Sequence, residues 1–179
     1  MGSRVAVAAP HPAGIAAARV AVGRGGNAID AALSAAAALT VAYPHQCSVG
    51  GDLVALVRPP GGPVRAVLSV GAAAQALDVD ALRAAGGRMP ASGPLTVTVP
   101  GVVAGWAAVH GEGARLGLAD LVEPAAELAE RGVAVSAGLA RAAAARADVV
   151  RAELSALLLD GADPSVRAPA GRRAAPRGR

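Results

Sequence analysis

The sequence predicts an α+β fold, in which several helices are combined with a few short strands. Apolar residues recur at helical spacing in some stretches and alternate in others, without the regular strand–helix–strand repeat of a parallel α/β protein. Hydrophobic residues make up 54% of the 179 residues and charged residues 17%, a balance that excludes a disordered or fibrous chain. We find no internal repeat, and the length suffices for one domain with a core.

The composition also predicts how that core is built. Trp106 and Tyr43 are the only aromatic residues, and phenylalanine is absent. Buried area must therefore come from alanine, valine and leucine. Because alanine contributes little area, such a core requires backbones that approach one another closely.

The first third of the chain predicts a strand and two helices. Residues 5–9 have the composition of a short buried strand, and Pro12 suits the first turn of a helix that a glycine-rich stretch then ends. Asn27 is a good N-cap for the next helix, with Asp30 three residues later in a capping-box arrangement. That helix, residues 28–42, has apolar or small residues on every side, which predicts that it is buried.

The remaining elements follow from turn residues and apolar spacing. Residues 53–57 and 64–68 flank a turn rich in proline and glycine and predict a hairpin. Asp78 starts a short helix that a glycine pair ends, and alternation over residues 95–99 predicts a strand. Pro100 and Gly101 open a helix in which Trp106 is expected to anchor the core. Further helices are predicted over residues 118–130, 136–146 and 149–159.

The charges exclude nucleic acid as a partner. The formal net charge is +4, but five of the 17 arginines lie in the last thirteen residues. Without them 12 basic residues face 13 acidic ones, a net charge of −1, and no arginine stripe with interleaved aromatics is present. Residues 1–159 are predicted to form the folded region. Residues 160–179, rich in arginine, proline and alanine, are predicted to be a disordered tail.

The sequence predicts no targeting signal, membrane span, catalytic cysteine or metal site. We see no signal peptide, and the longest apolar run is too short for a membrane span, so a cytoplasmic protein is expected. Cys47 is the sole cysteine, which rules out an internal disulfide. His45 lies two residues before it, but a catalytic Cys–His pair normally converges from separate parts of a fold, so both are interpreted as loop-packing residues. His11 and His110 have no partner at ligand spacing, and we predict neither a metal nor a cofactor.

Three further patterns have a structural and a functional interpretation. Gly50 and Gly51 either allow a substrate to approach the backbone or make a tight entry into a strand, and we favour the second. Arg24-Gly-Gly-Asn27 resembles a phosphate loop only superficially, because it has no lysine and follows a helix. The acidic residues of the 118–130 helix are interpreted as a solvated face.

Four segments, in this order, resemble the large-subunit region of gamma-glutamyltransferases. They are GGNAIDA at residues 25–31, PHQCSVGGD at 44–52, GPLTVTVPGVVAGW at 93–106 and LVEPAAELAERG at 121–132. Each is a weak glycine- and alanine-rich pattern, but their order and spacing cover about residues 5–145 and are together quite specific.

This resemblance implies a fold, a mechanism and a partner. Family members are N-terminal-nucleophile hydrolases with an αββα sandwich, so this chain is expected to form part of such a sandwich, incomplete without the small subunit. The precursor cuts itself, and the new N-terminal threonine of the small subunit attacks a gamma-glutamyl amide such as that of glutathione. Its α-amine serves as the base, and backbone N–H groups hold the oxyanion.

The sequence departs from the family pattern in two respects. Its three threonines, Thr40, Thr96 and Thr98, do not lie in a family-like cleavage context, so we assign no catalytic residue and expect the chain to be inactive alone. The family also places an arginine after the hairpin, where it grips the glutamyl α-carboxylate. Here Ala72, or Gly71 under a one-residue shift, occupies that place, while Arg65 belongs to the hairpin. The substrate-binding residues therefore stay unknown. The alternatives are a non-catalytic truncated remnant or scaffold, and part of an acylase with a non-glutamyl substrate.

Overall fold

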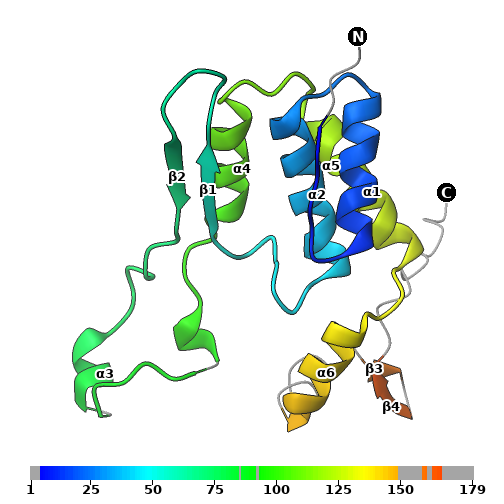
Figure 1. The fold of residues 1–179 in the computed structure, drawn as a ribbon. Coiled ribbons are helices and arrows are strands. Elements are labelled where there is room, and N and C mark those ends of the chain that lie inside the picture. Colours follow the sequence, from blue (N-terminus) through cyan, green and yellow to red (C-terminus); the bar gives the residue numbers. More distant parts are fainter. Residues whose placement is uncertain (1–4, 85, 92, 149–158, 161–162, 167–179) are drawn as a thin grey trace, which may run out of the picture. The chain divides into compact units, whose positions relative to one another are not determined.

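The computed structural model describes residues 5–84, 86–91, 93–148, 159–160 and 163–166 (Figure 1). The chain divides into two compact units, one formed by Met1–Ser48 with His110–Arg179 and the other by Val49–Val109. Within the described residues, no helix combines the length and apolarity that crossing a membrane requires. The described residues form both helices and strands, as the sequence predicts.

The first unit is a layer of helices held together by small side chains. Helices α1 (Pro12–Gly23), α2 (Ala28–Ala42) and α5 (Leu118–Arg131) lie side by side, and α6 (Ala137–Ala145) follows α5 along the chain (Figure 1). Alanines dominate the buried set of α1 and α2. A Cβ added at Gly14 would lie 3.3 Å from the Leu39 Cγ, so glycine allows close approach here. The predicted alanine-rich core with closely spaced backbones is confirmed.

The start of α2 confirms the predicted capping box. The Asn27 side chain accepts hydrogen bonds from the backbone N–H groups of Ile29 and Asp30, and the Asp30 carboxylate accepts one from the Asn27 N–H. The Asp30 side chain is fully buried and also binds the backbone of the segment before α5. The cap therefore ties the start of α2 to a part of the chain that is distant in sequence.

The predicted strand over residues 5–9 is extended but belongs to no sheet in the described residues. Its side chains alternate between half-buried and exposed, and Val5 and Val7 pack against the core alanines of α1 and α2. The alternation is that of a strand, whereas a strand assignment also requires a neighbouring backbone with which to pair.

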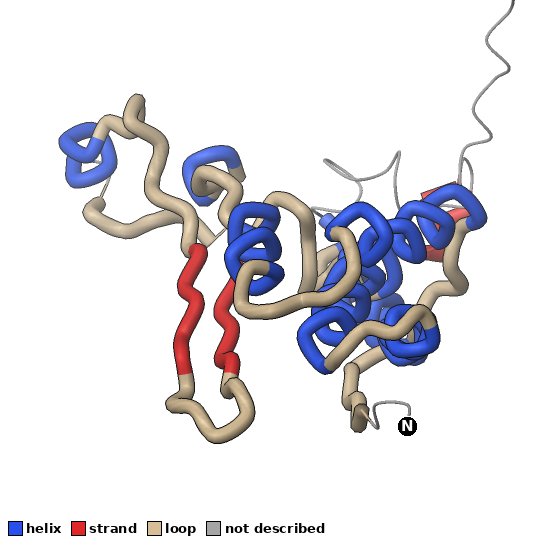
Figure 2. Tube along the Cα trace, turned by 90° about the horizontal axis from the view of Figure 1, so that it is seen from above, coloured by secondary structure: helices blue, strands red, loops and turns tan. Residues whose placement is uncertain are grey.

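The second unit is built around a hairpin. Strands β1 (Leu53–Val57) and β2 (Arg65–Ser69) lie side by side (Figure 2). They pair in antiparallel fashion with Leu53 opposite Ser69. The second strand begins and ends one residue later than the predicted range of 64–68. Helix α4 (Val102–His110) packs on the hairpin at Gly105, where an added Cβ would lie 2.7 Å from the Leu53 Cβ and 2.9 Å from the Ser69 Cβ. The unit also contains α3 (Val79–Ala84) and a 3₁₀ turn, η1 (Pro94–Thr96).

The prediction of a strand at residues 95–99 is wrong. Pro94 opens η1, in which both the backbone N–H and the hydroxyl of Thr96 donate to the Gly93 carbonyl. This local hydrogen bonding replaces the sheet pairing that the alternation suggested. The predicted helix over residues 149–159 lies outside the described residues except for its last position. At the boundary between the predicted folded region and the predicted tail, Leu159–Asp160 (β3) pairs with Asp163–Val166 (β4), and residues 167–179 lie outside the description.

Candidate functional site

The candidate site is the segment of residues 69–72, which begins at the last residue of β2 and which we call the exit segment. It contains positions 71 and 72, at which the sequence resemblance leads us to expect the family's arginine. The Ser69 hydroxyl donates to the Gly101 carbonyl at 2.7 Å, and the Ala72 carbonyl accepts from the Val99 N–H at 2.9 Å. The exit segment is therefore held along the chain that leads into α4, within the second unit.

Gly71 has no room for a side chain. A Cβ built on its backbone would collide with the Val99 carbonyl oxygen and lie 2.7 Å from the Thr98 Oγ1. Because the obstacle at Val99 is backbone, it cannot turn aside as a flexible side chain would. Of the two positions that the sequence leaves open for the missing arginine, only Ala72, which is exposed, has space for a longer side chain.

Asp52 fixes the exit segment from its other side. Its Oδ1 accepts a hydrogen bond from the Gly71 N–H at 2.7 Å, a short bond of the charge-assisted kind. The neighbouring Gly51 carbonyl accepts from the N–H groups of Gly101 and Val102 at 3.0 and 2.9 Å, so the start of α4 anchors the residue before Asp52. The carboxylate is thus positioned at the end of the hairpin by contacts on the carbonyl of the preceding residue and on its own Oδ1.

Sequence reasoning did not identify Asp52 as a neighbour of the exit segment. The register of the hairpin indicates that Asp52 lies beside this segment. Because Leu53 pairs with Ser69, the residue before Leu53 lies beside the residues that follow Ser69. A correct register would have placed an aspartate at this end.

Arg65 does not supply the missing cation at the exit segment. It is the first residue of β2 and pairs with Val57, whereas Ser69 is the last residue of the same strand. Four residues of extended chain separate their Cα atoms by about 13 Å. The prediction that Arg65 belongs to the hairpin strand is confirmed, and the charged group that contacts Gly71 is the Asp52 carboxylate.

His45 and Cys47 are packed in the loop after α2. The Tyr43 and His45 rings have centroids 4.2 Å apart, and a Cβ added at Gly138 would lie 3.3 Å from the His45 Nε2. No hydrogen bond joins the two side chains in the described structure. Burial raises the pKa of the Cys47 thiol, which disfavours the thiolate that a nucleophile requires.

The three threonines all lie inside the chain. The Thr40 hydroxyl donates to the Ala37 carbonyl within α2, and the Thr96 hydroxyl donates to Gly93 in η1, both at 2.8 Å. Thr98 stands beside the exit segment. In each of them the α-nitrogen is part of a peptide bond, so it could act as a base only after a cleavage that made the threonine N-terminal.

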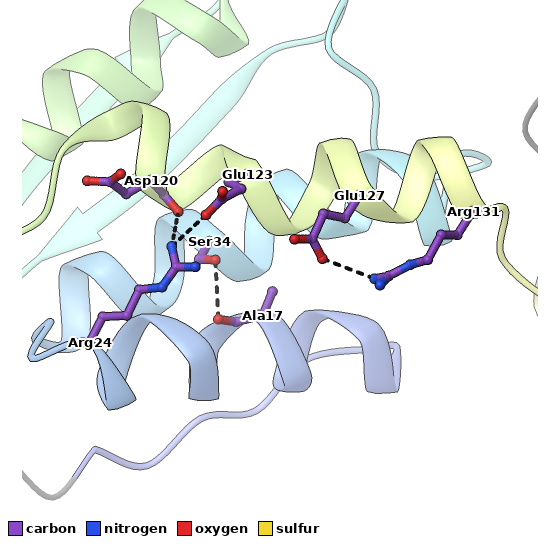
Figure 3. A network of polar contacts seen from close by, with 7 residues as sticks. All are labelled: Ala17, Arg24, Ser34, Asp120, Glu123, Glu127 and Arg131. Carbon is purple, nitrogen blue, oxygen red and sulfur yellow. Dashed lines mark hydrogen bonds and ion pairs between the residues drawn. The ribbon is translucent and has the colours of Figure 1, made fainter. Parts of the chain in front are cut away.

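The charged residues of α5 form structural contacts. Figure 3 shows Arg24 pointing toward Glu123, and Arg131 toward Glu127. The Arg24 Nη1 lies 2.7 Å from the Glu123 Oε2, and the Arg131 Nη2 lies 3.2 Å from the Glu127 Oε2. In the same view the Ser34 hydroxyl of α2 donates to the Ala17 carbonyl of α1 at 3.2 Å. The ion pairs are half-exposed and contribute little. Among the described residues, no group of three histidine, cysteine, aspartate or glutamate side chains has the arrangement of a metal site.

Comparisons with known proteins agree with the sequence resemblance. A family model described as gamma-glutamyltranspeptidase matches residues 15–167. The glutathione hydrolase-like YwrD proenzyme of Bacillus subtilis is 35% identical over 143 residues, which cover 79% of this chain and 27% of that protein. The oxamate amidohydrolase proenzyme of Klebsiella pneumoniae is 37% identical over 150 residues, which cover 80% of this chain and 28% of that protein.

Solved structures show the same similarity in three dimensions. The gamma-glutamyltranspeptidase of Helicobacter pylori superposes with a TM-score of 0.78 at 28% identity, over 96% of this chain and 51% of that one. The cephalosporin acylase of Bacillus halodurans gives a TM-score of 0.75 at 33% identity, over 88% of this chain and 31% of that one. The chain thus spans less than a third of the two curated relatives above.

Proposed function

Because the chain belongs to the gamma-glutamyltranspeptidase family, we propose that it is a large-subunit region of an amide hydrolase or acyltransferase of the N-terminal-nucleophile type. In this proposal the chain contributes part of an αββα sandwich and acts only together with a small-subunit region. That region supplies the terminal threonine that attacks the amide. The chain described here supplies scaffold and one wall of the acyl-donor site.

The observation that carries the proposal is the position of the threonines. A member of this family needs a threonine whose α-amine is free, and Thr40, Thr96 and Thr98 are all held within α2, η1 or the segment after it. A nucleophile from outside these residues is therefore the assignment that we propose. The names of the two curated relatives agree with this division, since both are proenzymes.

For the substrate we propose an acylated amine without a strict requirement for a gamma-glutamyl group. The exit segment presents Ala72 where the family pattern has a guanidinium, and Gly71 has no room for one. Relatives of comparable identity include an oxamate amidohydrolase and a cephalosporin acylase, so the family accommodates different acyl donors. Hydrolysis or transfer of the acyl group then follows the covalent route common to such nucleophiles.

A non-catalytic remnant or scaffold is the second candidate. It is favoured by the change to an arginine-, proline- and alanine-rich composition after Asp160. The nucleotide sequence downstream of the Arg179 codon tests both candidates. A small-subunit-like region there, in frame or frame-shifted, with a threonine at a cleavage site supports the enzyme. A downstream sequence without any such region supports the remnant.

A further inference from the structure

The end of the hairpin that holds the exit segment carries a negative charge. The Asp52 side chain is exposed, and the bond from the Gly71 N–H to its Oδ1 is the only hydrogen bond that the described residues give it. No ion pair between described residues includes this carboxylate. Its second oxygen, Oδ2, can therefore accept a hydrogen bond from a ligand.

The position of this charge is restrained by contacts on the Asp52 side chain and on the backbone beside it. The start of α4 holds the Gly51 carbonyl, and the Gly71 N–H holds Oδ1. The exit segment is restrained on the side of Val99. The Val99 carbonyl lies against Gly71, and the Val99 N–H donates to the Ala72 carbonyl. A carboxylate held in this way is already restrained, so less entropy of this side chain is lost when a ligand binds it.

Ala72 lies within the range of this charge. Gly71 and Ala72 are consecutive, so the Ala72 side chain is within about 8 Å of the Asp52 carboxylate by chain geometry. That distance is shorter than the screening length of about 10 Å at 0.1 M salt. A group bound over Ala72 therefore experiences the negative potential of Asp52, with no opposing arginine at position 71 or 72.

We infer that Asp52 is a specificity-determining residue, which selects acyl donors bearing an ammonium or another hydrogen-bond-donating group over donors bearing a carboxylate. This inference rests on the proposed function, because it takes the exit segment to be a wall of the acyl-donor site. It goes further by assigning a charge preference and naming the residue that sets it. A donor carboxylate over Ala72 would face a like charge, whereas an amine or amide N–H would meet the free oxygen of Asp52.

The experiment measures this preference at Ala72 without turnover. In a Cys47→Ser background, Ala72→Cys places a thiol at the exit segment. Its rates of modification by aminoethyl methanethiosulfonate, a cation, and sulfonatoethyl methanethiosulfonate, an anion, are then compared. Both reagents react with the same thiolate, so the thiolate fraction cancels in their ratio. The cation-to-anion rate ratio therefore reports how the site discriminates between charged ligands.

We expect Asp52→Asn to lower this ratio by roughly three- to tenfold, because the amide still accepts from the Gly71 N–H but carries no charge. Asp78→Asn is the matched control. Asp78 is also exposed and lies in the same unit, and its Oδ1 accepts from the Ala81 N–H at 2.8 Å. That change should leave the ratio unaltered, and Asp52→Ser, a second neutral acceptor, should reproduce the effect of Asp52→Asn.

A ratio that is the same with Asp52 and with both neutral replacements would overturn the inference, as would an equal fall in Asp78→Asn. Because no turnover is measured, a failure of the amide-hydrolase proposal would leave this result intact. Conversely, an unchanged ratio would remove the charge preference without touching the need for an external nucleophile.

Discussion

Both carboxylate oxygens of Asp30 accept a hydrogen bond from the backbone N–H of Arg115, at 3.0 and 3.1 Å, although the two residues are 85 positions apart. Asp30 Oδ1 also accepts from the Leu116 N–H at 3.0 Å, and Oδ2 from the Asn27 N–H at 2.7 Å. The side chain is fully buried. A capping residue has thus become the link between α2 and the segment that leads into α5.

Replacing Asp30 with alanine should open this part of the first unit. Three backbone N–H groups would lose their acceptor in a buried setting, at a cost of about 3 kcal/mol or more. Hydrogen exchange followed by mass spectrometry should show faster exchange in α2 and in residues 111–118. Asp120→Ala, an exposed aspartate on α5, is the control and should leave these segments protected. Unchanged protection in Asp30→Ala would show that the buried carboxylate is dispensable.

Substitution of Gly105 should also destabilise the structure, because the absence of a side chain there lets α4 approach the hairpin. An alanine Cβ there would lie 2.7 Å from the Leu53 Cβ and 2.9 Å from the Ser69 Cβ, so the helix must move away. Overpacking of this kind costs about 1–3 kcal/mol. We expect Gly105→Ala to increase hydrogen exchange in β1, β2 and α4. Gly50→Ala, in the same unit but with open space around it, should not do so.

These contacts also show which parts of the structure the sequence predicts. The capping box at Asn27 and Asp30 and the bounds of α2 depend on local signals, and both were predicted correctly. The additional bonds from Arg115 and Leu116 to Asp30 are long-range, and no local pattern encodes them. The same holds for Asp52 and Gly71, which meet only because the hairpin register places them together.

The strand at residues 95–99 was predicted wrongly for a different reason: a local pattern was present, but other local signals outweighed it. Alternation of threonine with leucine and valine fits a strand, but Pro94 and the Thr96 hydroxyl satisfy the backbone locally. Residues 5–9 show the same limit, since their burial alternates as in a strand while the described residues offer no partner. Strand propensity predicts the conformation of a segment, whereas the existence of a sheet depends on backbone from elsewhere.

Purified alone, the chain should not turn over a gamma-glutamyl anilide. None of its three threonines has a free α-amine, and the Cys47 thiol has a pKa raised by burial, so no nucleophile is activated. Release of the aniline dye is the measurement, with heat-treated protein as the baseline. Dye release above that baseline, if lost on replacing any one of these threonines, would contradict the proposed division of labour.

Once activity is obtained with a small-subunit region, Ala72→Arg should shift the substrate preference. A guanidinium at this exposed position can pair with the α-carboxylate of a gamma-glutamyl group, an interaction worth about 1.5–3 kcal/mol. The ratio of kcat/KM for gamma-glutamyl over simple acyl donors should therefore rise at least several-fold. Ala73→Arg, which adds the same charge one residue later, is the control. An equal shift in both variants would assign the effect to net charge rather than to position 72.

The last prediction concerns the outer face of the hairpin. Val54, Leu56 and Leu68 are 68%, 73% and 70% exposed, and the register places Val54 directly opposite Leu68. The inner face, by contrast, packs against α4 at Gly105. A two-stranded hairpin with one uncovered apolar face and unpaired edges is a site for association with other chains. We therefore expect the isolated chain to self-associate, to bind hydrophobic dyes and to melt without a sharp transition.

Lysine on the outer face should suppress this association. Leu56→Lys and Leu68→Lys add a charge to side chains that already face solvent, so they should lower the sedimenting mass and the dye fluorescence while β1 and β2 keep their exchange protection. Val57→Lys is the matched control, because Val57 is only 9% exposed and a buried lysine should instead unfold the hairpin. If the unmodified chain sediments as a single monomer, melts cooperatively and binds no dye, its apolar face needs no cover. The dependence on a small-subunit region would then lose its physical basis, because the second unit would be stable without one.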